Sequence, residues 1–306
     1  MYGKAIKESS YIQRTYRLET KLGSGGSGAV YLAWHSRLNK HVVIKVVESC
    51  SSEDIRIHRN EVEALKNIKS LHIPQVLDFF IESEKSYTVM EFIDGISFDK
   101  LLKWGERFLE AQVITWYNQL ALTLELIHKN DIFHRDIKPA NIMLTKSGDV
   151  CLIDFNSAFV SGNNTGLISR SMGYASPEQY EYFKVCKNRQ AGEPHEMKTY
   201  PEYLETSLLA GDCKTEPMLR QNTAILSVNN QIDWKLSDIY SLGATVFHLL
   251  TGKRPPVTAG DVAKITKLKG YSKALLKVME KSMQSEPSER FASANELGAK
   301  VQHLIY

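Results

Sequence analysis

The stretch that decides the fold reads His134-Arg135-Asp136-Ile137-Lys138-Pro139-Ala140-Asn141, and Asp154-Phe155-Asn156 follows it after one short apolar strand. Asp136 lies five residues before the amide of Asn141, and a second carboxylate, Asp154, comes next. Carboxylate and amide oxygens are ligands that Mg²⁺ accepts in proteins. Together the three side chains predict a site that holds Mg²⁺-ATP and orients a hydroxyl nucleophile.

Four polar side chains of this stretch have predicted roles in catalysis or metal binding. We expect Asp136 to act as the catalytic base, or at least to orient the substrate hydroxyl. Lys138 is placed to neutralise charge on the transferred phosphoryl group. Asn141 and Asp154 are the predicted metal ligands. The probability that so long an ordered pattern occurs by chance is very small.

Glycines gather nearer the N-terminus, in Gly23-Ser24-Gly25-Gly26-Ser27-Gly28-Ala29-Val30, between two strand-like segments. Glycines let a backbone approach phosphates closely and expose its amides to them. A flexible hairpin would look the same, so this pattern alone leaves both explanations open. A dinucleotide site would need a helix after the glycines, whereas a strand follows here. The predicted nucleotide contacts are Gly23, Ser24, Gly25, Gly26, Ser27, Gly28 and Val30.

Lys45 lies in the β-branched strand Val42–Val47. A buried lysine destabilises a protein unless its charge is paired. We expect Lys45 to pair with Glu61 on the next helix and with the nucleotide phosphates. Glu63 is the alternative partner, on a different face of that helix. The other explanation is a lysine at a strand edge whose ammonium group reaches solvent.

The hydrophobic pattern changes near Glu91–Gly95, from strand-like to helical. A cleft between two such lobes is a natural ligand site. Before this point the predicted elements are strands at Tyr16–Thr20, Ala29–Ala33, Val42–Val47, Val76–Ile81 and Tyr87–Phe92, and a helix at Asp54–Lys69. After it, the predicted helices are Leu109–Lys129, Ser237–Leu250, Tyr271–Met283 and Ala292–Leu304.

Composition narrows the class of protein. The chain has 306 residues, 43% of them hydrophobic and 24% charged, which is normal for a globular protein. A formal net charge of +3 without a long basic block argues against nucleic-acid or anionic-membrane partners. Four cysteines without CxxC pairing indicate reduced thiols rather than a zinc site. No apolar run is long enough to span a bilayer and no signal-peptide core is present, so we expect a cytoplasmic chain. A membrane anchor in a longer parent chain stays open.

With these motifs in order, the chain resembles the protein kinase family, and closely the bacterial eukaryotic-type Ser/Thr kinases, from about Tyr16 to Leu304. Three further landmarks carry the resemblance. The segment Ser171-Met172-Gly173-Tyr174-Ala175-Ser176-Pro177-Glu178 is similar to the family's GTxxYxxPE segment. Asp238-Ile239-Tyr240-Ser241-Leu242-Gly243 resembles the start of the helix that braces the catalytic loop. Arg290 matches the arginine that pairs with the glutamate of the first landmark, here Glu178.

The resemblance implies an α+β, bilobal protein-kinase-like fold. A small β-rich N-lobe would cover residues 16–93, after an N-terminal extension at 1–15. A larger, mainly α-helical C-lobe would cover 94–306, with an insertion at about 183–235. That insertion is either a loop variation with a short helix at Pro201–Gly211 or a docking element for a partner.

The resemblance also implies cofactors, substrates and further site residues. The cofactors would be ATP and Mg²⁺, with Mn²⁺ as an alternative, and the substrates would be proteins bearing Ser or Thr. Met90 would be the gatekeeper, and Glu91–Ile93 the hinge that receives adenine. Lys138, two residues after Asp136, is the Ser/Thr-type arrangement. Ser171 stands where threonine is usual and is expected to hydrogen-bond Asp136 and Lys138.

Three functions fit the sequence: a kinase that phosphorylates proteins including itself, a pseudokinase or nucleotide-binding scaffold, and a small-molecule kinase. Asn156, where the family usually has glycine, is the main support for the pseudokinase. We expect it to be tolerated because asparagine adopts positive φ more readily than most residues. A further hypothesis is that a phosphate on Thr165 or Ser169 contacts Arg135 and raises activity.

Overall fold

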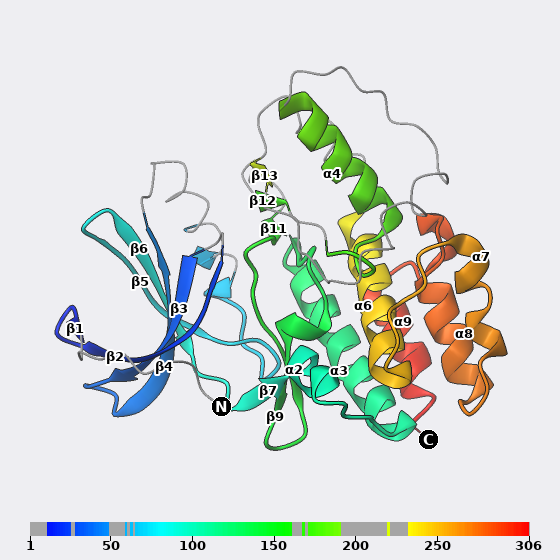
Figure 1. The fold of residues 1–306 in the computed structure, drawn as a ribbon, viewed down its shortest axis with the longest axis horizontal. Helices are drawn as coiled ribbons and strands as arrows, with labels where there is room; N and C mark the ends of the chain where they lie inside the picture. The colour runs from blue at the N-terminus through cyan, green and yellow to red at the C-terminus, as the bar shows by residue number, and fades with distance from the viewer. Residues whose placement is uncertain are drawn as a thin grey trace. The chain divides into compact units, whose positions relative to one another are not determined.

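A computed structural model describes residues 11–25, 28–48, 59, 62–63, 65–160, 167–168, 171–190, 219–220 and 232–305. The chain forms two compact units, Met1–Asp94 and Gly95–Tyr306 (Figure 1). The first is rich in strands and the second is mainly helical, as the predicted fold class requires. Among the described residues, no helix is both long and apolar enough to cross a membrane.

The first unit is built on a six-stranded antiparallel sheet with the order β1-β2-β3-β4-β6-β5 (Figure 1). Alternating apolar residues of these strands point to one face and form the core of the unit. That core comprises Ile12, Tyr16, Ala33, Val42, Ile44, Val46, Tyr87 and Val89. The strands are β1 Tyr11–Ile12, β2 Tyr16–Gly25, β3 Gly28–His35, β4 Lys40–Val47, β5 Val76–Glu82 and β6 Lys85–Glu91.

The helix predicted for Asp54–Lys69 lies largely outside the described residues. Of its described part, Arg59, Val62, Glu63 and Leu65 are helical. Lys66 N donates to Val62 O at 2.8 Å, which is the spacing of an α-helical turn. Glu61, the predicted partner of Lys45, is not among the described residues.

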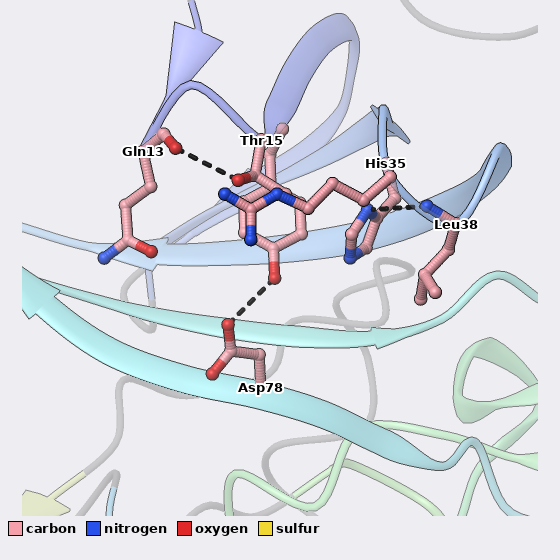
Figure 2. A pocket seen from close by; sticks show the side chains of 7 residues that line it. Gln13, Thr15, His35, Leu38 and Asp78 are labelled. Atoms are coloured by element: carbon pink, nitrogen blue, oxygen red, sulfur yellow. Dashed lines mark hydrogen bonds between the residues drawn. The ribbon is translucent and has the colours of Figure 1, made fainter.

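A pocket of about 370 Å³ lies in the first unit beside the turn between β1 and β2 (Figure 2). The Tyr16 hydroxyl donates to Asp78 Oδ2 at 2.8 Å, and Leu38 N donates to His35 Nδ1 at 3.3 Å. Burial, and then the bond to Asp78, raise the pKa of Tyr16, so this hydroxyl stays protonated. Among the described residues that line the pocket, none is a predicted site residue. They are Gln13, Thr15, Tyr16, His35, Arg37, Leu38 and Asp78.

The second unit is organised around two long helices, α3 at Glu110–Lys129 and α6 at Trp234–Thr251. Helix α3 packs against α6 and α9, and α8 packs against α6 and α9 (Figure 1). Helix α6 is capped at its start by Asp233, whose side chain accepts from Lys235 N, and at its end by Gly252 in the left-handed region at φ +65°. The other α-helices described are α2 Phe98–Lys103, α4 Pro177–Gln190, α7 Ala259–Val262, α8 Lys273–Ser282 and α9 Ala294–Gln302.

Short strands carry the predicted catalytic stretch. Strand β8 (Ile132–Phe133) precedes His134 and pairs with β11 (Phe159–Val160). Strand β9 (Ile142–Thr145) follows Asn141, lies between β7 (Gly95–Ser97) and β10 (Val150–Leu152), and is antiparallel to both. Strand β10 therefore returns the chain toward Asn141 just before Asp154. A further pair joins β12 (Leu167–Ile168) to β13 (Leu219–Arg220).

The start of the predicted insertion is helical, because α4 continues to Gln190. Tyr182 and Phe183 of α4 are buried in one cluster with Trp234 of α6 and with Phe133 and Phe159. These contacts join residues about fifty positions apart, which local periodicity does not show. Residues 191–218 and 221–231 lie outside the described part, and with them the predicted helix at 201–211.

Candidate active site

A tight turn brings the predicted catalytic side chains together. Pro139 begins the 3₁₀ turn Pro139–Asn141, after Lys138 in an extended conformation. The turn closes with a hydrogen bond from Asn141 N to Lys138 O at 2.9 Å. Proline suits the first position of such a turn because it needs no amide donor there. The turn directs Lys138 and Asn141 back toward Asp136.

The Asp136 carboxylate, on a residue only 7% exposed, accepts hydrogen bonds at both oxygens. Ser171 Oγ donates to Oδ1 at 2.6 Å. Lys138 Nζ donates to Oδ2 at 2.8 Å, and Asn141 Nδ2 donates to the same oxygen at 3.1 Å. Lys138 Nζ also donates to Ser171 Oγ at 2.9 Å, as the resemblance implied. The carboxylate is thus held in one orientation beside a cation and a hydroxyl.

A second buried carboxylate, Asp238 on α6, braces the main chain of the loop. Its Oδ2 accepts from His134 N at 2.8 Å and its Oδ1 accepts from Arg135 N at 2.8 Å. His128 Nε2, from the end of α3, lies 3.0 Å from Oδ2. Asp238 is completely buried, so these bonds form away from water. They hold Arg135 at φ +60°, which is uncommon for a residue other than glycine.

The second predicted metal ligand, Asp154, lies in the turn after β10. Ile153 N donates to Asn141 O at 2.8 Å, which keeps the two predicted ligands adjacent. Asp154 is exposed and has φ +66°. Phe155 is buried, and its ring lies 4.7 Å from that of His134, centroid to centroid. Asn156 Nδ2 donates to Asp154 Oδ1.

The reason expected for tolerance of Asn156 is wrong. Positive φ was expected at Asn156, but the described residues that have it include Asp154 and not Asn156. The backbone at Asn156 therefore needs no glycine. Its side-chain amide instead bonds the predicted metal ligand.

The first unit holds the predicted nucleotide residues. Lys45 on β4 is 5% exposed and lies opposite Val30 on β3 and Thr88 on β6. In the glycine segment, Gly23 pairs with Val30, Ser24 with Ala29, and Gly25 with Gly28 across β2 and β3. Gly26 and Ser27 lie outside the described residues. Met90 is half-buried at the end of β6, Glu91 is exposed and Ile93 is half-buried.

The predicted pair of Arg290 and Glu178 forms with two hydrogen bonds. Arg290 Nη1 lies 2.6 Å from Glu178 Oε1, and Nη2 lies 2.9 Å from Oε2. The guanidinium also donates to main-chain oxygens of Leu236 and Gln284, at 2.9 and 2.8 Å. Its carbon lies 5.0 Å from the centre of the Tyr240 ring. This pair joins the start of α4 to the turn Pro287–Glu289 that precedes α9, and the same guanidinium contacts α6.

Arg135 is 1% exposed and packs between aromatic rings. Its guanidinium carbon lies 5.4 Å from the centre of Phe159 and 5.0 Å from that of Trp234. Arg135 Nε donates to Ser157 O at 2.6 Å. The phosphorylation sites of the hypothesis, Thr165 and Ser169, lie outside the described residues, so their contact with Arg135 stays a prediction.

Three residues that hold the loop, directly or through a neighbour, were not predicted from the sequence to do so: Gln179, Ser237 and His128. Gln179 is completely buried, and its Nε2 donates to Arg135 O at 2.6 Å. Ser237 Oγ lies 3.3 Å from Gln179 Oε1. His128 adds the bond to Asp238 described above. The one signal for Gln179 is its position directly after Glu178, and His128 has no local signal.

A partly buried pair links the segment Ser171–Glu178 to α6. Tyr174 and His248 of α6 share a hydrogen bond of 2.6 Å between the hydroxyl and Nδ1. Burial lowers the pKa of His248 to about 4, and the charges of Arg254 and Arg107 act in the same direction while Asp99 opposes them. The imidazole is therefore neutral near pH 7, where it keeps its hydrogen bond to the Tyr174 hydroxyl.

A family model described as protein kinase domain matches residues 16–193, more than half of the chain. The chain therefore belongs to the protein kinase family. A probable serine/threonine-protein kinase of Clostridium acetobutylicum is 27% identical over 94% of this chain and 39% of that protein. Serine/threonine-protein kinases PknA of Corynebacterium glutamicum is 28% identical over 94% and 55%, respectively. Serine/threonine-protein kinase C of Synechocystis is 29% identical over 95% and 50%.

The family match confirms the predicted family, and the relatives confirm the predicted likeness to bacterial kinases that are named as serine/threonine kinases. The chain spans between 39% and 55% of the length of the three relatives. Protein kinases as a family use ATP and Mg²⁺ and act on proteins.

Proposed function

We propose that this chain transfers the γ-phosphoryl group of ATP to serine and threonine hydroxyls of proteins, itself included. The observation that supports this most is the buried carboxylate of Asp136, which Lys138, Asn141 and Ser171 all hydrogen-bond. The names of the bacterial relatives describe the same acceptor residues.

In the proposed reaction, the acceptor oxygen forms a bond to the γ-phosphorus. The bond from that phosphorus to the β–γ bridging oxygen breaks, and ADP leaves with that oxygen. The hydroxyl proton passes to the carboxylate of Asp136. Lys138 supplies positive charge beside the transferred group. Because these groups are already hydrogen-bonded in place, little reorganisation is needed during the reaction.

The residues proposed to hold Mg²⁺, or Mn²⁺ in its place, are Asn141 and Asp154. Across the described residues, Oδ1 of Asn141 and Oδ2 of Asp154 accept no hydrogen bond, so both oxygens are available as ligands. The bond from Ile153 N to Asn141 O keeps these residues adjacent. When bound, the metal neutralises negative charge on the phosphates.

In the proposed N-lobe, residues 16–93, Lys45 and the segment Gly23–Val30 would bind phosphates. Glu61 would pair with Lys45, and Met90, Glu91 and Ile93 would contact adenine. The burial of Lys45 directly opposite Val30 supports this assignment, because it brings the lysine and the glycine segment to the same part of the sheet.

Transfer of label from γ-labelled ATP to a generic protein substrate tests the proposal. We expect the wild type to label the substrate, and Asp136→Asn to lower the rate by a factor of about 10² to 10⁴ because the base is lost. Lys45→Met should also lose transfer. Asp131→Asn is the matched control, because it removes an exposed carboxylate five residues earlier and asparagine tolerates the φ of +55° there.

The alternatives give different results in the same assay. A pseudokinase would bind ATP without labelling any protein, and Asp136→Asn would then behave like the wild type. A small-molecule kinase would consume ATP without labelling protein. Label in the wild type and in Asp131→Asn, but not in Asp136→Asn, excludes both.

A further inference from the structure

The side chain of Asn156 has a contact that the usual glycine of this position cannot make. Its Nδ2 donates to Oδ1 of Asp154, two residues earlier. Oδ2 of Asp154, in contrast, accepts no hydrogen bond from the described residues. One carboxylate oxygen is therefore held by an amide, and the other remains for a ligand.

The backbone on both sides of this contact is fixed by other bonds. Before Asp154, Ile153 N donates to Asn141 O at 2.8 Å. After Asn156, Ser157 O accepts from Arg135 Nε at 2.6 Å, and Ala158 N donates to Phe155 O at 2.9 Å. Phe155 is 2% exposed, so the turn is also anchored in the core. With the main chain held, the largest remaining freedom of Asp154 is rotation of its exposed side chain.

We propose that Asn156 is a positioning residue for the metal ligand Asp154. This inference rests on the proposed function, in which Asp154 holds Mg²⁺. The amide of Asn156 holds Oδ1, which restricts the carboxylate to one rotamer and directs Oδ2 toward the cation beside Asn141. A ligand ordered in advance loses less conformational freedom when the metal binds. Partners that orient metal ligands in this way change metal affinity measurably when they are removed.

The contact between Asn156 and Asp154 also distinguishes two explanations for an asparagine where the family usually has glycine. If glycine served this position through backbone freedom, asparagine would be a neutral or harmful replacement. Asn156 has no positive φ, so it makes no use of such freedom. The proposal therefore predicts that restoring glycine weakens metal binding in this chain, and that alanine, which has no extra backbone freedom, weakens it equally.

Metal binding tests the proposal without measuring phosphoryl transfer. Mn²⁺ occupies oxygen-ligand sites like those of Mg²⁺, and free Mn²⁺ is quantified by electron paramagnetic resonance. The full chain is titrated with Mn²⁺ in the presence of a non-hydrolysable ATP analogue. We expect the dissociation constant for Mn²⁺ to rise about tenfold in both Asn156→Ala and Asn156→Gly.

Asn130→Ala is the matched control, since Asn130 Nδ2 donates to Leu126 O at 2.9 Å at the exposed end of α3. It loses the same kind of bond outside the site and should bind Mn²⁺ like the wild type. Wild-type affinity in Asn156→Ala overturns the inference, as does wild-type affinity in Asn156→Gly alone. If the wild type takes up no Mn²⁺, the proposed metal site fails and the inference with it. If the wild type binds Mn²⁺ and transfers phosphate while both variants match it, only the inference fails.

Discussion

The catalytic loop and the glycine segment are held in opposite ways. His134 N and Arg135 N bond Asp238, which lies 104 and 103 positions away in the sequence and is fully buried. The glycine segment Gly23–Gly28, where described, is held by cross-strand pairing between β2 and β3. Gly23 and Ser24 are exposed. Long-range buried bonds fix the groups proposed to carry the chemistry, whereas the described part of the glycine segment is held by local strand pairing.

The largest loss of stability is expected from Asp238→Ala, which removes the carboxylate that accepts hydrogen bonds from His134 N and Arg135 N. Two main-chain amides and His128 Nε2 would lose their acceptor inside the protein. Because buried polar groups without partners are strongly unfavourable, the free energy of unfolding should fall by about 3 to 5 kcal/mol. Urea denaturation followed by tryptophan fluorescence measures it.

Asp233→Asn is the control for Asp238→Ala, because it changes an exposed aspartate at the start of the same helix and asparagine caps helices equally well. Its stability should match the wild type. Equal stability of Asp238→Ala and Asp233→Asn would contradict the claim that the loop depends on α6.

A smaller effect is expected from Arg290→Lys. Lysine keeps the charge but cannot make both bonds to Glu178 and those to Leu236 and Gln284. We expect a loss of about 1 to 3 kcal/mol in the free energy of unfolding. Arg17→Lys, at an exposed ion pair with Glu19, should change it by less than about 1 kcal/mol. Similar losses in the two variants would show that burial of the pair is unimportant.

The glycine segment offers a matched pair of substitutions. Gly28 has φ +108°, and a Cβ there would lie 2.3 Å from Val46 O. Gly23 has no atom within 4 Å of such a Cβ. Gly28→Ala should therefore destabilise the first unit by about 1 to 2 kcal/mol and raise the KM for ATP, whereas Gly23→Ala should be milder. Thermal unfolding and initial rates measure both, and equal effects would contradict the geometry.

The smallest expected effect is the contribution of His248 to the pH dependence of stability. The pKa of His248 is about 4 in the folded chain, below the ordinary value of 6.5. Above pH 6.5 neither state binds the proton, so His248 adds no pH dependence. As pH falls from 6.5 to about 4, the unfolded chain binds a proton that the folded chain rejects, and stability decreases. His248→Gln should flatten this slope between pH 6.5 and 4, while His303→Gln, at an exposed position, should keep it.

The sequence predicted those parts of the site whose residues lie in one short ordered stretch. One stretch of six consecutive positions contains Asp136, Lys138 and Asn141, so a single 3₁₀ turn brings their side chains together. Glu178 and Arg290 lie 112 positions apart and were paired only through the family resemblance. The elements β4, α3 and α6 were predicted close to their observed bounds, because their apolar patterns are long and regular.

Other contacts depend on tertiary packing and could not be predicted. Gln179 bonds Arg135 O from 44 positions away, and His128 bonds Asp238 from 110 positions away. Helix α4 has a weak apolar period, and its burial depends on Trp234 from α6. The reason expected for tolerance of Asn156 was wrong because φ, which the sequence does not show, is positive at Asp154 instead.

In the proposed reaction Asp136, held by its buried partners, carries phosphoryl transfer to serine or threonine. The most direct test of this role is identification of the phosphorylated amino acid after incubation with ATP and Mg²⁺. Three peptides, identical except for Ser, Thr or Tyr at the acceptor position, serve as substrates for wild type and Asp136→Asn. We expect phosphoserine or phosphothreonine with the wild type, and a yield lower by a factor of about 10² to 10⁴ with Asp136→Asn. Phosphotyrosine alone, or equal transfer by the two proteins, would contradict it.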